Sequence, residues 1–114
     1  MTERRKNQRQ PMDLFFNKYL DGFPFLGRAV DLSLDGLLSV AYTEPEIDPA
    51  SFPLELRLPG QTQSLWVWGR VARRSGRQHA IQFLRMSPRD RRRLKAHLES
   101  APDTAADLGL RPVV

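Results

Sequence analysis

The sequence predicts a mainly β domain: a six-stranded antiparallel β-barrel, followed by a C-terminal α-helix and preceded by a flexible basic N-terminal arm. In short apolar runs along the chain, side chains alternate between two faces, which is the period of a β-strand. Glycine, proline and aspartate separate these runs at the spacing of hairpin links. After residue 86 the pattern changes to that of one amphipathic helix. Short strands with hairpin links favour a barrel, because closure removes the exposed edges of the sheet.

Each predicted strand is bounded by residues that favour turns. The first strand is rich in aromatic side chains and ends at Asp21-Gly22, a pair typical of two-residue hairpins. The fourth has the clearest alternation, with leucines at every second position and charged residues between them. Residues 43–52 contain two prolines and three acids and are predicted as a surface loop, and Ser75-Gly76 is predicted as a tight turn. The strands are predicted at residues 13–20, 25–33, 37–42, 54–58, 65–74 and 78–83.

The helix is predicted to start after Ser87 and to end near residue 100, before a proline. Ser87 has the residue type of an N-cap, and Pro88 suits the first helical position. Asp90 stands at the third helical position, where an acid completes a capping box. Leu94 and Leu98 lie four residues apart, so they form a narrow apolar stripe that can dock on the barrel.

We expect one domain over residues 1–100, in which residues 1–12 form the flexible arm, and a mobile tail over residues 101–114. A chain of 114 residues has room for one hydrophobic core. It contains no cysteine, which excludes disulfides and thiolate chemistry and fits a reducing compartment. No apolar run approaches the roughly 20 residues of a membrane span. The basic N-terminus continues into polar residues, unlike a secretory signal. The sequence therefore predicts a cytoplasmic protein.

The net charge of +5 is unevenly distributed along the chain. Residues 1–9 hold four bases against one acid, and residues 70–97 hold ten bases against one acid. The segment between them, residues 10–69, holds three bases against eight acids. This alternation disfavours uniform coating of a polyanion such as nucleic acid. It favours discrete sites for phosphate or for acidic partners.

The residue pattern favours binding over catalysis. His79 and His97 are far apart in the sequence, and His79 is interpreted as a buried or rim histidine with a hydrogen-bond partner. Ser33 lies between leucines and lacks the glycines of a nucleophile elbow. No spacing of acids indicates a general acid/base pair or a metal site, and no glycine-rich phosphate loop is present. We therefore expect neither enzymatic activity nor a metal nor a cofactor.

The arginines of the N-terminal arm are candidate ligand-binding residues. Arg5 and Arg9 are separated by three residues, and Arg4 precedes the first of them. A guanidinium can hold phosphate oxygens in a fork, bind the edge of guanine and stack on a purine ring. Arginines on a mobile arm can therefore close over a nucleotide and become ordered when it binds. The alternative is a terminus that only adds solubility.

The second candidate element is the polar side of the segment that starts at Asp31. Strand alternation places Asp31 and Ser33 on one face and Val30 and Leu32 on the other. The Asp31 carboxylate can accept hydrogen bonds from the N1 and N2 donors of guanine. Ser33 and the backbone near Gly36 can donate to phosphate, and the glycine permits close approach of a ligand. The alternative is a hairpin whose polar face meets only solvent.

Together, Arg5-x-x-x-Arg9 and Asp31-x-Ser33-x-x-Gly36 resemble the paired signature of the PilZ domain family. The resemblance covers about residues 4–99. Members of this family are six-stranded antiparallel barrels that bind the bacterial second messenger cyclic di-GMP. The resemblance implies that Arg5 and Arg9 hold phosphate and stack on guanine, with Arg4 as a further candidate, that Asp31 and Ser33 read the guanine edge, and that Gly36 allows close approach.

The resulting hypothesis is a non-enzymatic cyclic di-GMP receptor whose arginine arm closes over the ligand and signals to a protein partner. One alternative is a PilZ-like protein-protein adaptor with a silent nucleotide site, since Asp35 adds a negative charge near a dianionic ligand. A non-specific nucleic-acid binder that uses residues 70–97 is disfavoured. The arginine-rich face of the helix is either solvated or docks an acidic partner. Trp66 and Trp68 are interpreted as packing beneath a helix, as a dimer contact, or as flanks of a bound guanine.

Overall fold

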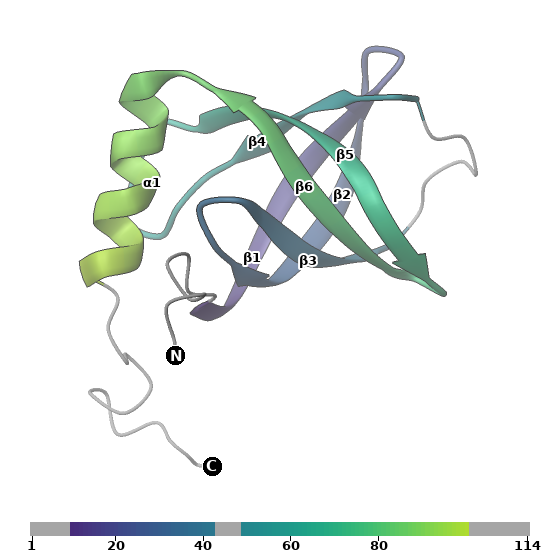
Figure 1. Cartoon of the computed structure of the whole chain (residues 1–114), viewed down its shortest axis with the longest axis horizontal. Coiled ribbons are helices and arrows are strands. Elements are labelled where there is room, and N and C mark those ends of the chain that lie inside the picture. Colours follow the sequence, from purple (N-terminus) through teal and green to yellow (C-terminus); the bar gives the residue numbers. More distant parts are fainter. Residues whose placement is uncertain (1–9, 43–48, 101–114) are drawn as a thin grey trace, which may run out of the picture.

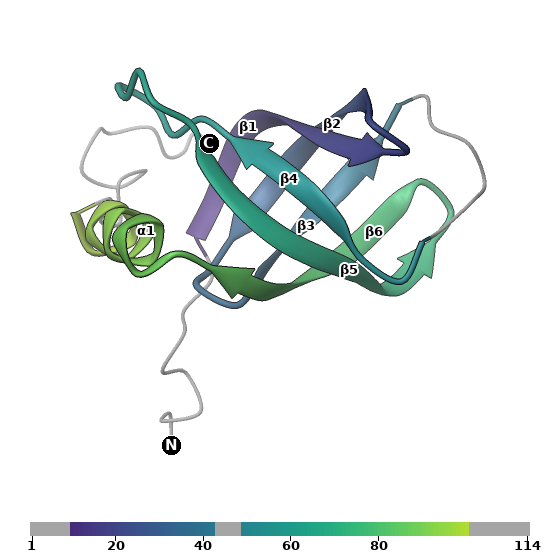
Figure 2. The ribbon, with the colours of Figure 1, turned by 90° about the horizontal axis from the view of Figure 1, so that it is seen from above.

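Six strands and one helix make up the part of the chain that the computed structural model describes, residues 10–42 and 49–100. All strand pairs are antiparallel, and the strands close into a barrel in the order β1-β2-β3-β6-β5-β4 (Figures 1 and 2). The helix stands beside one end of this barrel (Figure 1). The predicted fold class is confirmed. The elements are β1 Gln10–Leu20, β2 Phe23–Leu32, β3 Gly36–Ala41, β4 Phe52–Leu56, β5 Leu65–Ser75, β6 Gln78–Met86 and α1 Pro88–Ser100.

Several strand boundaries differ from the predicted ones, because pairing with a neighbouring strand decides where a strand ends. β1 begins at residue 10, so residues 10–12, which were predicted as part of the arm, belong to the barrel. Residues 1–9 of the arm and the predicted tail 101–114 lie outside the described residues. β4 is displaced towards the N-terminus, since its pairing with β5 runs from Phe52 opposite Gly69 to Leu56 opposite Leu65. Leu58 lies beyond β4 and is still buried.

Two hairpin turns show how local sequence sets the register of the barrel. Asp21-Gly22 joins β1 to β2 as predicted, with Leu20 paired to Phe23. The φ angles of Asp21 and Gly22 are 54° and 83°, and two successive positive values are typical of a type I′ turn. The turn between β5 and β6 is Gly76-Arg77 rather than the predicted Ser75-Gly76, because Ser75 still pairs with the first residue of β6.

The core fills the barrel with the inward-facing residues of the strands. Lys18 lies on the inward face of β1 and is only 3% exposed. Its Nζ atom lies 4.5 Å from the centroid of the Phe52 ring, a cation–π contact that the sequence analysis did not identify. The buried apolar residues are Leu14, Phe16, Leu20, Ala29, Leu32, Leu37, Phe52, Leu54, Leu56, Leu58, Leu65, Val67, Ile81, Leu94 and Leu98.

The helix is attached to the barrel by its apolar stripe and by one carboxylate. Leu94 and Leu98 are buried, as predicted. The Ser87 hydroxyl accepts a hydrogen bond from the backbone N–H of Asp90 at 3.1 Å, which confirms the N-cap. The Asp90 carboxylate accepts hydrogen bonds from the backbone N–H of Trp66 at 3.1 Å and from the Arg93 guanidinium at 3.0 Å. Asp90 therefore ties the helix to the start of β5, a tertiary role that the predicted capping box does not include.

Neither a membrane-spanning helix nor a metal-binding cluster is found among the described residues. None of the helices in residues 10–42 and 49–100 is long and apolar enough to cross a membrane. Within the same residues, no group of three or more histidine, aspartate and glutamate side chains is placed to hold a metal ion.

Replacing Asp90 with alanine should destabilise the protein by about 1–3 kcal/mol, because the partly buried N–H of Trp66 loses its acceptor and Arg93 loses its carboxylate. Urea unfolding followed by circular dichroism measures this change. The control is Glu99→Ala, which removes an exposed acid from the same helix and should change stability by less than about 0.5 kcal/mol. Equal unfolding midpoints for the two variants would contradict the role given to Asp90.

Candidate functional site

The segment from Asp31 to Gly36 leaves β2 and turns into β3, and the turn is closed by Ser33. The backbone N–H of Ser33 donates to the Gly36 carbonyl at 2.9 Å. The Ser33 hydroxyl donates to the same carbonyl at 3.3 Å and accepts from the backbone N–H of Asp35 at 3.2 Å. With 2% of its surface exposed, the Ser33 side chain is part of the turn. The prediction that Ser33 stands beside Asp31 on an exposed polar face is wrong.

β2 ends at Leu32, so Ser33 lies in the turn, beyond the alternation of the strand. A β-bulge changes the alternation before that point. The pairing of β2 with β3 shifts between Ala29, which lies opposite Ser39, and Asp31, which lies opposite Leu38. A bulge adds one residue on one strand and reverses the alternation beyond it. Ala29 and Leu32 are therefore both fully buried although they are three residues apart. Alternation along the sequence cannot reveal such a shift, because the shift is set by the partner strand.

Gly36 is needed for the close approach of β3 to β6. A Cβ atom at this position would overlap the Ile81 carbonyl oxygen and would lie 3.3 Å from the Gln82 Cα atom. The turn is also tied to β6 by a hydrogen bond of 2.7 Å from the Phe83 N–H to the Asp35 carbonyl. From the sequence alone, this glycine is expected to permit the approach of a ligand. The structure provides a second reason for it, which is the packing of two backbones.

The strand register brings the Asp31 segment next to the beginning of β1. Pro11 lies opposite Asp31, and Gln10 lies opposite Leu32. Arg4, Arg5 and Arg9 lie outside the described residues, but Arg9 directly precedes Gln10 in the chain. Five extended residues span at most about 18 Å, so the chain itself sets this upper limit on the distance between the Cα atoms of Arg5 and Gln10. The half-buried Asp31 thus shares one end of the β1–β2 pair with the attachment point of the arm.

The other residues that the sequence analysis singled out lie elsewhere. His79 is 2% exposed, and its Nε2 atom accepts a hydrogen bond of 2.6 Å from the Arg74 guanidinium. The interpretation of His79 as a buried histidine with a partner is therefore confirmed. Trp66 and Trp68 lie on the outer surface of β5, which is three strands away from β2 in either direction around the barrel. Both indoles are nearly half exposed, so they do not pack beneath the helix.

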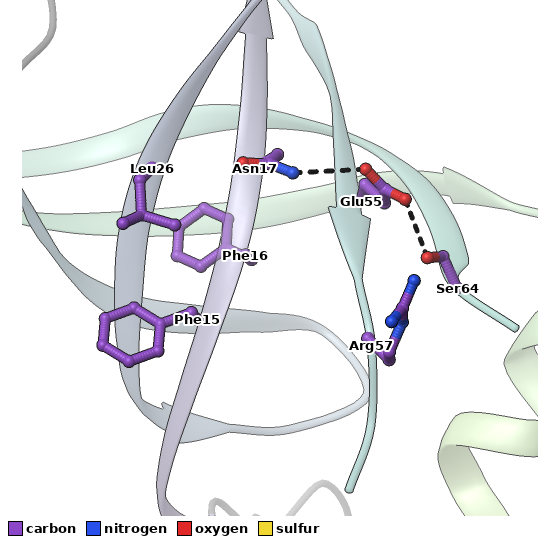
Figure 3. Close-up of a pocket in the computed structure, with 7 residues that line it drawn as sticks. All are labelled: Phe15, Phe16, Asn17, Leu26, Glu55, Arg57 and Ser64. Carbon is purple, nitrogen blue, oxygen red and sulfur yellow. Dashed lines mark hydrogen bonds between the residues drawn. The ribbon is translucent and has the colours of Figure 1, made fainter. Parts of the chain in front are cut away.

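A shallow pocket of about 270 Å³ lies on the outer face of β1, β2 and β4 (Figure 3). It is lined by Glu55, whose carboxylate accepts hydrogen bonds from Ser64 at 2.8 Å, Tyr19 at 3.0 Å and Asn17 at 3.3 Å. The hydrogen bond from Ser64 is the main cause that lowers the pKa of Glu55, and those from Asn17 and Tyr19 add to it. The sequence showed Glu55 only as a polar position of β4. The lining residues are Phe15, Phe16, Asn17, Leu26, Glu55, Arg57 and Ser64.

A family model described as the PilZ domain matches residues 3–100. Among solved structures, the chain is similar to the PilZ domain with c-di-GMP of YcgR from Escherichia coli, with a TM-score of 0.73, 21% identity and coverage of 96% of this chain and 99% of that chain. It is also similar to YcgR from Escherichia coli in complex with c-di-GMP, with a TM-score of 0.70, 24% identity and coverage of 93% and 49%.

A third similar structure is the Bacillus subtilis inhibitor of motility MotI/DgrA, with a TM-score of 0.65, 17% identity and coverage of 86% of this chain and 53% of that chain. The chain thus spans about half the length of MotI/DgrA and of the YcgR chain in the second structure. At these identities the similarity is one of fold. No curated protein sequence matches the chain.

Replacing Gly36 with alanine should destabilise the protein by about 1–3 kcal/mol even without ligand, because the added methyl group forces β3 away from the Ile81 backbone. Urea unfolding measures the effect. The control Asp35→Asn changes an exposed side chain in the same turn, keeps the backbone hydrogen bonds and should alter stability by less than about 0.5 kcal/mol. An unchanged stability of Gly36→Ala would show that β6 does not require the glycine.

Replacing Glu55 with glutamine should reduce the loss of stability in acid. The folded pKa of Glu55 is lowered from its ordinary value of 4.5, so its contribution is complete above that value and is lost as the pH falls through the lower folded pKa. The wild type should therefore lose more stability than Glu55→Gln when the pH is lowered from neutral to below 4.5. Urea midpoints of both proteins against pH check this, and parallel curves would contradict it.

Proposed function

The chain belongs to the PilZ domain family, and on this basis we propose that it is a receptor that binds the bacterial second messenger cyclic di-GMP without chemically changing it. The observation that supports this most directly is the register of β1 and β2. It places Pro11 opposite Asp31, and Arg9 precedes Pro11 by two residues in the chain. Similar structures of YcgR contain c-di-GMP, which adds support for this ligand. We assign this function to the bacterial cytoplasm, where a second messenger acts.

The proposed site combines a rigid part with a moving part. The rigid part is the turn from Ser33 to Gly36, which hydrogen bonds hold to itself and to β6. Asp31, at the end of β2, is presented by this support and accepts hydrogen bonds from the N1 and N2 donors of guanine. The moving part is the arm, in which Arg5 and Arg9 hold the phosphates in charge-assisted hydrogen bonds and stack on the bases, with Arg4 as a further contact.

Ser33 and Gly36 have a supporting role in this proposal. The Ser33 hydroxyl donates one hydrogen bond and accepts another within the turn. The position that a Cβ atom of residue 36 would occupy is filled by the Ile81 carbonyl oxygen. Their substitution should therefore weaken binding by displacing Asp31 and the turn backbone. The direct contacts come from Asp31 and the arginines. Closure of the arm over the ligand changes the surface at this end of the barrel, and we propose that a protein partner detects this change.

The second candidate function is that of a protein-protein adaptor that does not bind the nucleotide. One observation favours it: Asp35 is exposed in the same turn and adds a negative charge where a dianionic ligand would bind. In that case a partner should bind equally well with and without cyclic di-GMP, and replacement of Arg5 and Arg9 should leave its affinity unchanged.

Isothermal titration with cyclic di-GMP decides between the two functions. Arg9→Ala and Asp31→Ala should each weaken binding by about one to two orders of magnitude, because each removes a bidentate contact worth about 1–3 kcal/mol. The matched control is Arg77→Ala, which removes an exposed arginine from the turn between β5 and β6 and should leave the affinity unchanged. Equal heats for the wild type, Arg9→Ala and Asp31→Ala, or no heat for the wild type, would exclude the receptor.

A further inference from the structure

The outer surface of β5 and β6, together with Tyr19 of β1, carries an aromatic and basic patch that the proposed nucleotide site does not use. We call this patch the tryptophan face and define it by Tyr19, Trp66, Trp68, Arg70 and Arg85. Trp66 and Trp68 are 47% and 46% exposed and lie at alternate positions of β5, so both indoles point outward. The Tyr19 ring lies with its centroid 5.5 Å from that of Trp66 and extends the aromatic stripe.

Exposure of such an aromatic stripe to water is unfavourable in free energy. Tryptophan, tyrosine and arginine are the residue types that most often dominate the binding energy of protein interfaces. Exposed apolar patches with a polar rim mark interaction sites on soluble domains. The two indoles are the only tryptophans of the chain, and both belong to this face. Its composition therefore indicates a docking surface.

The charges around the indoles specify the chemistry of the occupant. Arg85 lies directly opposite Trp68 in the pairing of β5 with β6, and Arg70 is the next outward position of β5. From residue 65 to residue 89 the chain contains six arginines and no acid. An acidic segment that also carries apolar side chains would complement both the arginines and the indoles.

We propose that the tryptophan face docks an acidic segment of a partner protein that inserts apolar side chains between Trp66, Trp68 and their neighbours. A second copy of the chain fits less well, because two such faces would bring arginines against arginines. Glu55, opposite Trp66, is the nearest acid on the adjacent strand, and three hydrogen bonds already hold its carboxylate. A nucleic-acid strand stacked on both indoles would bring its phosphates close to the Glu55 carboxylate, which would repel them. A protein segment can instead have acidic residues only where they meet the arginines.

The tryptophan face is separate from the proposed nucleotide site. β5 and β2 lie on opposite walls of the barrel, and Figure 2 shows β4 and β5 in front with β2 and β3 fainter behind them. The acidic segment and a nucleotide can therefore be bound at the same time. The surface would supply the partner contact that a receptor needs, but its occupation requires no nucleotide, so the two proposals can fail independently.

The test uses the full chain and a short fluorescein-labelled peptide in which glutamates flank a central leucine and phenylalanine. We expect saturable binding at submillimolar concentration, seen in peptide anisotropy and in the emission of the two tryptophans. Trp68→Ala and Arg85→Glu should each weaken it at least about tenfold. A peptide with serines in place of the two apolar residues should also bind at least about tenfold more weakly, and one with lysines in place of the glutamates should not bind.

Four controls make the result specific. Arg77→Glu makes the same charge change beyond the end of β5, whose last residue lies roughly 23 Å along the strand from Trp68, and it should alter affinity by less than about twofold at physiological salt. Arg9→Ala should bind the peptide as the wild type does. A labelled oligothymidylate strand tests nucleic acid, and sedimentation of wild type and Trp68→Ala tests self-association.

Four results would overturn the proposal: no saturable binding of the acidic peptide, equal weakening by Arg77→Glu and Arg85→Glu, tighter Trp68-dependent binding of oligothymidylate, or a wild-type dimer that Trp68→Ala dissociates.

Discussion

Gly36 and Ile81 lie so close together that no side chain fits between β3 and β6 at this point, and the candidate site depends on that contact. The same turn is held by the Phe83 N–H on β6 and by the Ser33 hydroxyl. In the proposed receptor, a segment fixed at this many points would need no reorganisation when the ligand binds. The Asp31 carboxylate would then be a defined acceptor, and the entropy cost of binding would fall on the arm.

Closure of the barrel separates two kinds of surface. Every strand has two neighbours, so backbone groups are used internally and only outward side chains remain for recognition. β2 contributes Asp31 on one wall, and β5 contributes the two indoles on the opposite wall. β6 is common to both, because Phe83 bonds to the Asp35 carbonyl and Arg85 lies opposite Trp68. A small domain can in this way carry a nucleotide site and a partner surface that do not compete for space.

The parts of the fold that depend on local pattern were predictable. The Asp21-Gly22 hairpin needs positive φ angles, and aspartate followed by glycine is a pair that favours them. Leu94 and Leu98 are buried because four-residue spacing places them on one side of a helix. The tertiary contact of Asp90 could not be predicted from local pattern, because its carboxylate accepts a hydrogen bond from the Trp66 N–H, 24 positions away in the sequence. The buried Lys18 is similar, because the Phe52 ring beneath its ammonium group comes from another strand.

The sequence by itself determined the class of barrel, the terminal helix and the two motifs that link the chain to its family, because these follow from residue type and spacing. Tertiary structure decided what the motif residues do. The end of β2 at Leu32 left Ser33 inside the turn, and contact with β6 made Gly36 a packing requirement. The pairing of Pro11 with Asp31 brought the attachment of the arm to the same end of the strands. The last two depend on pairing between residues distant in the sequence, and no local pattern records which strand becomes the neighbour.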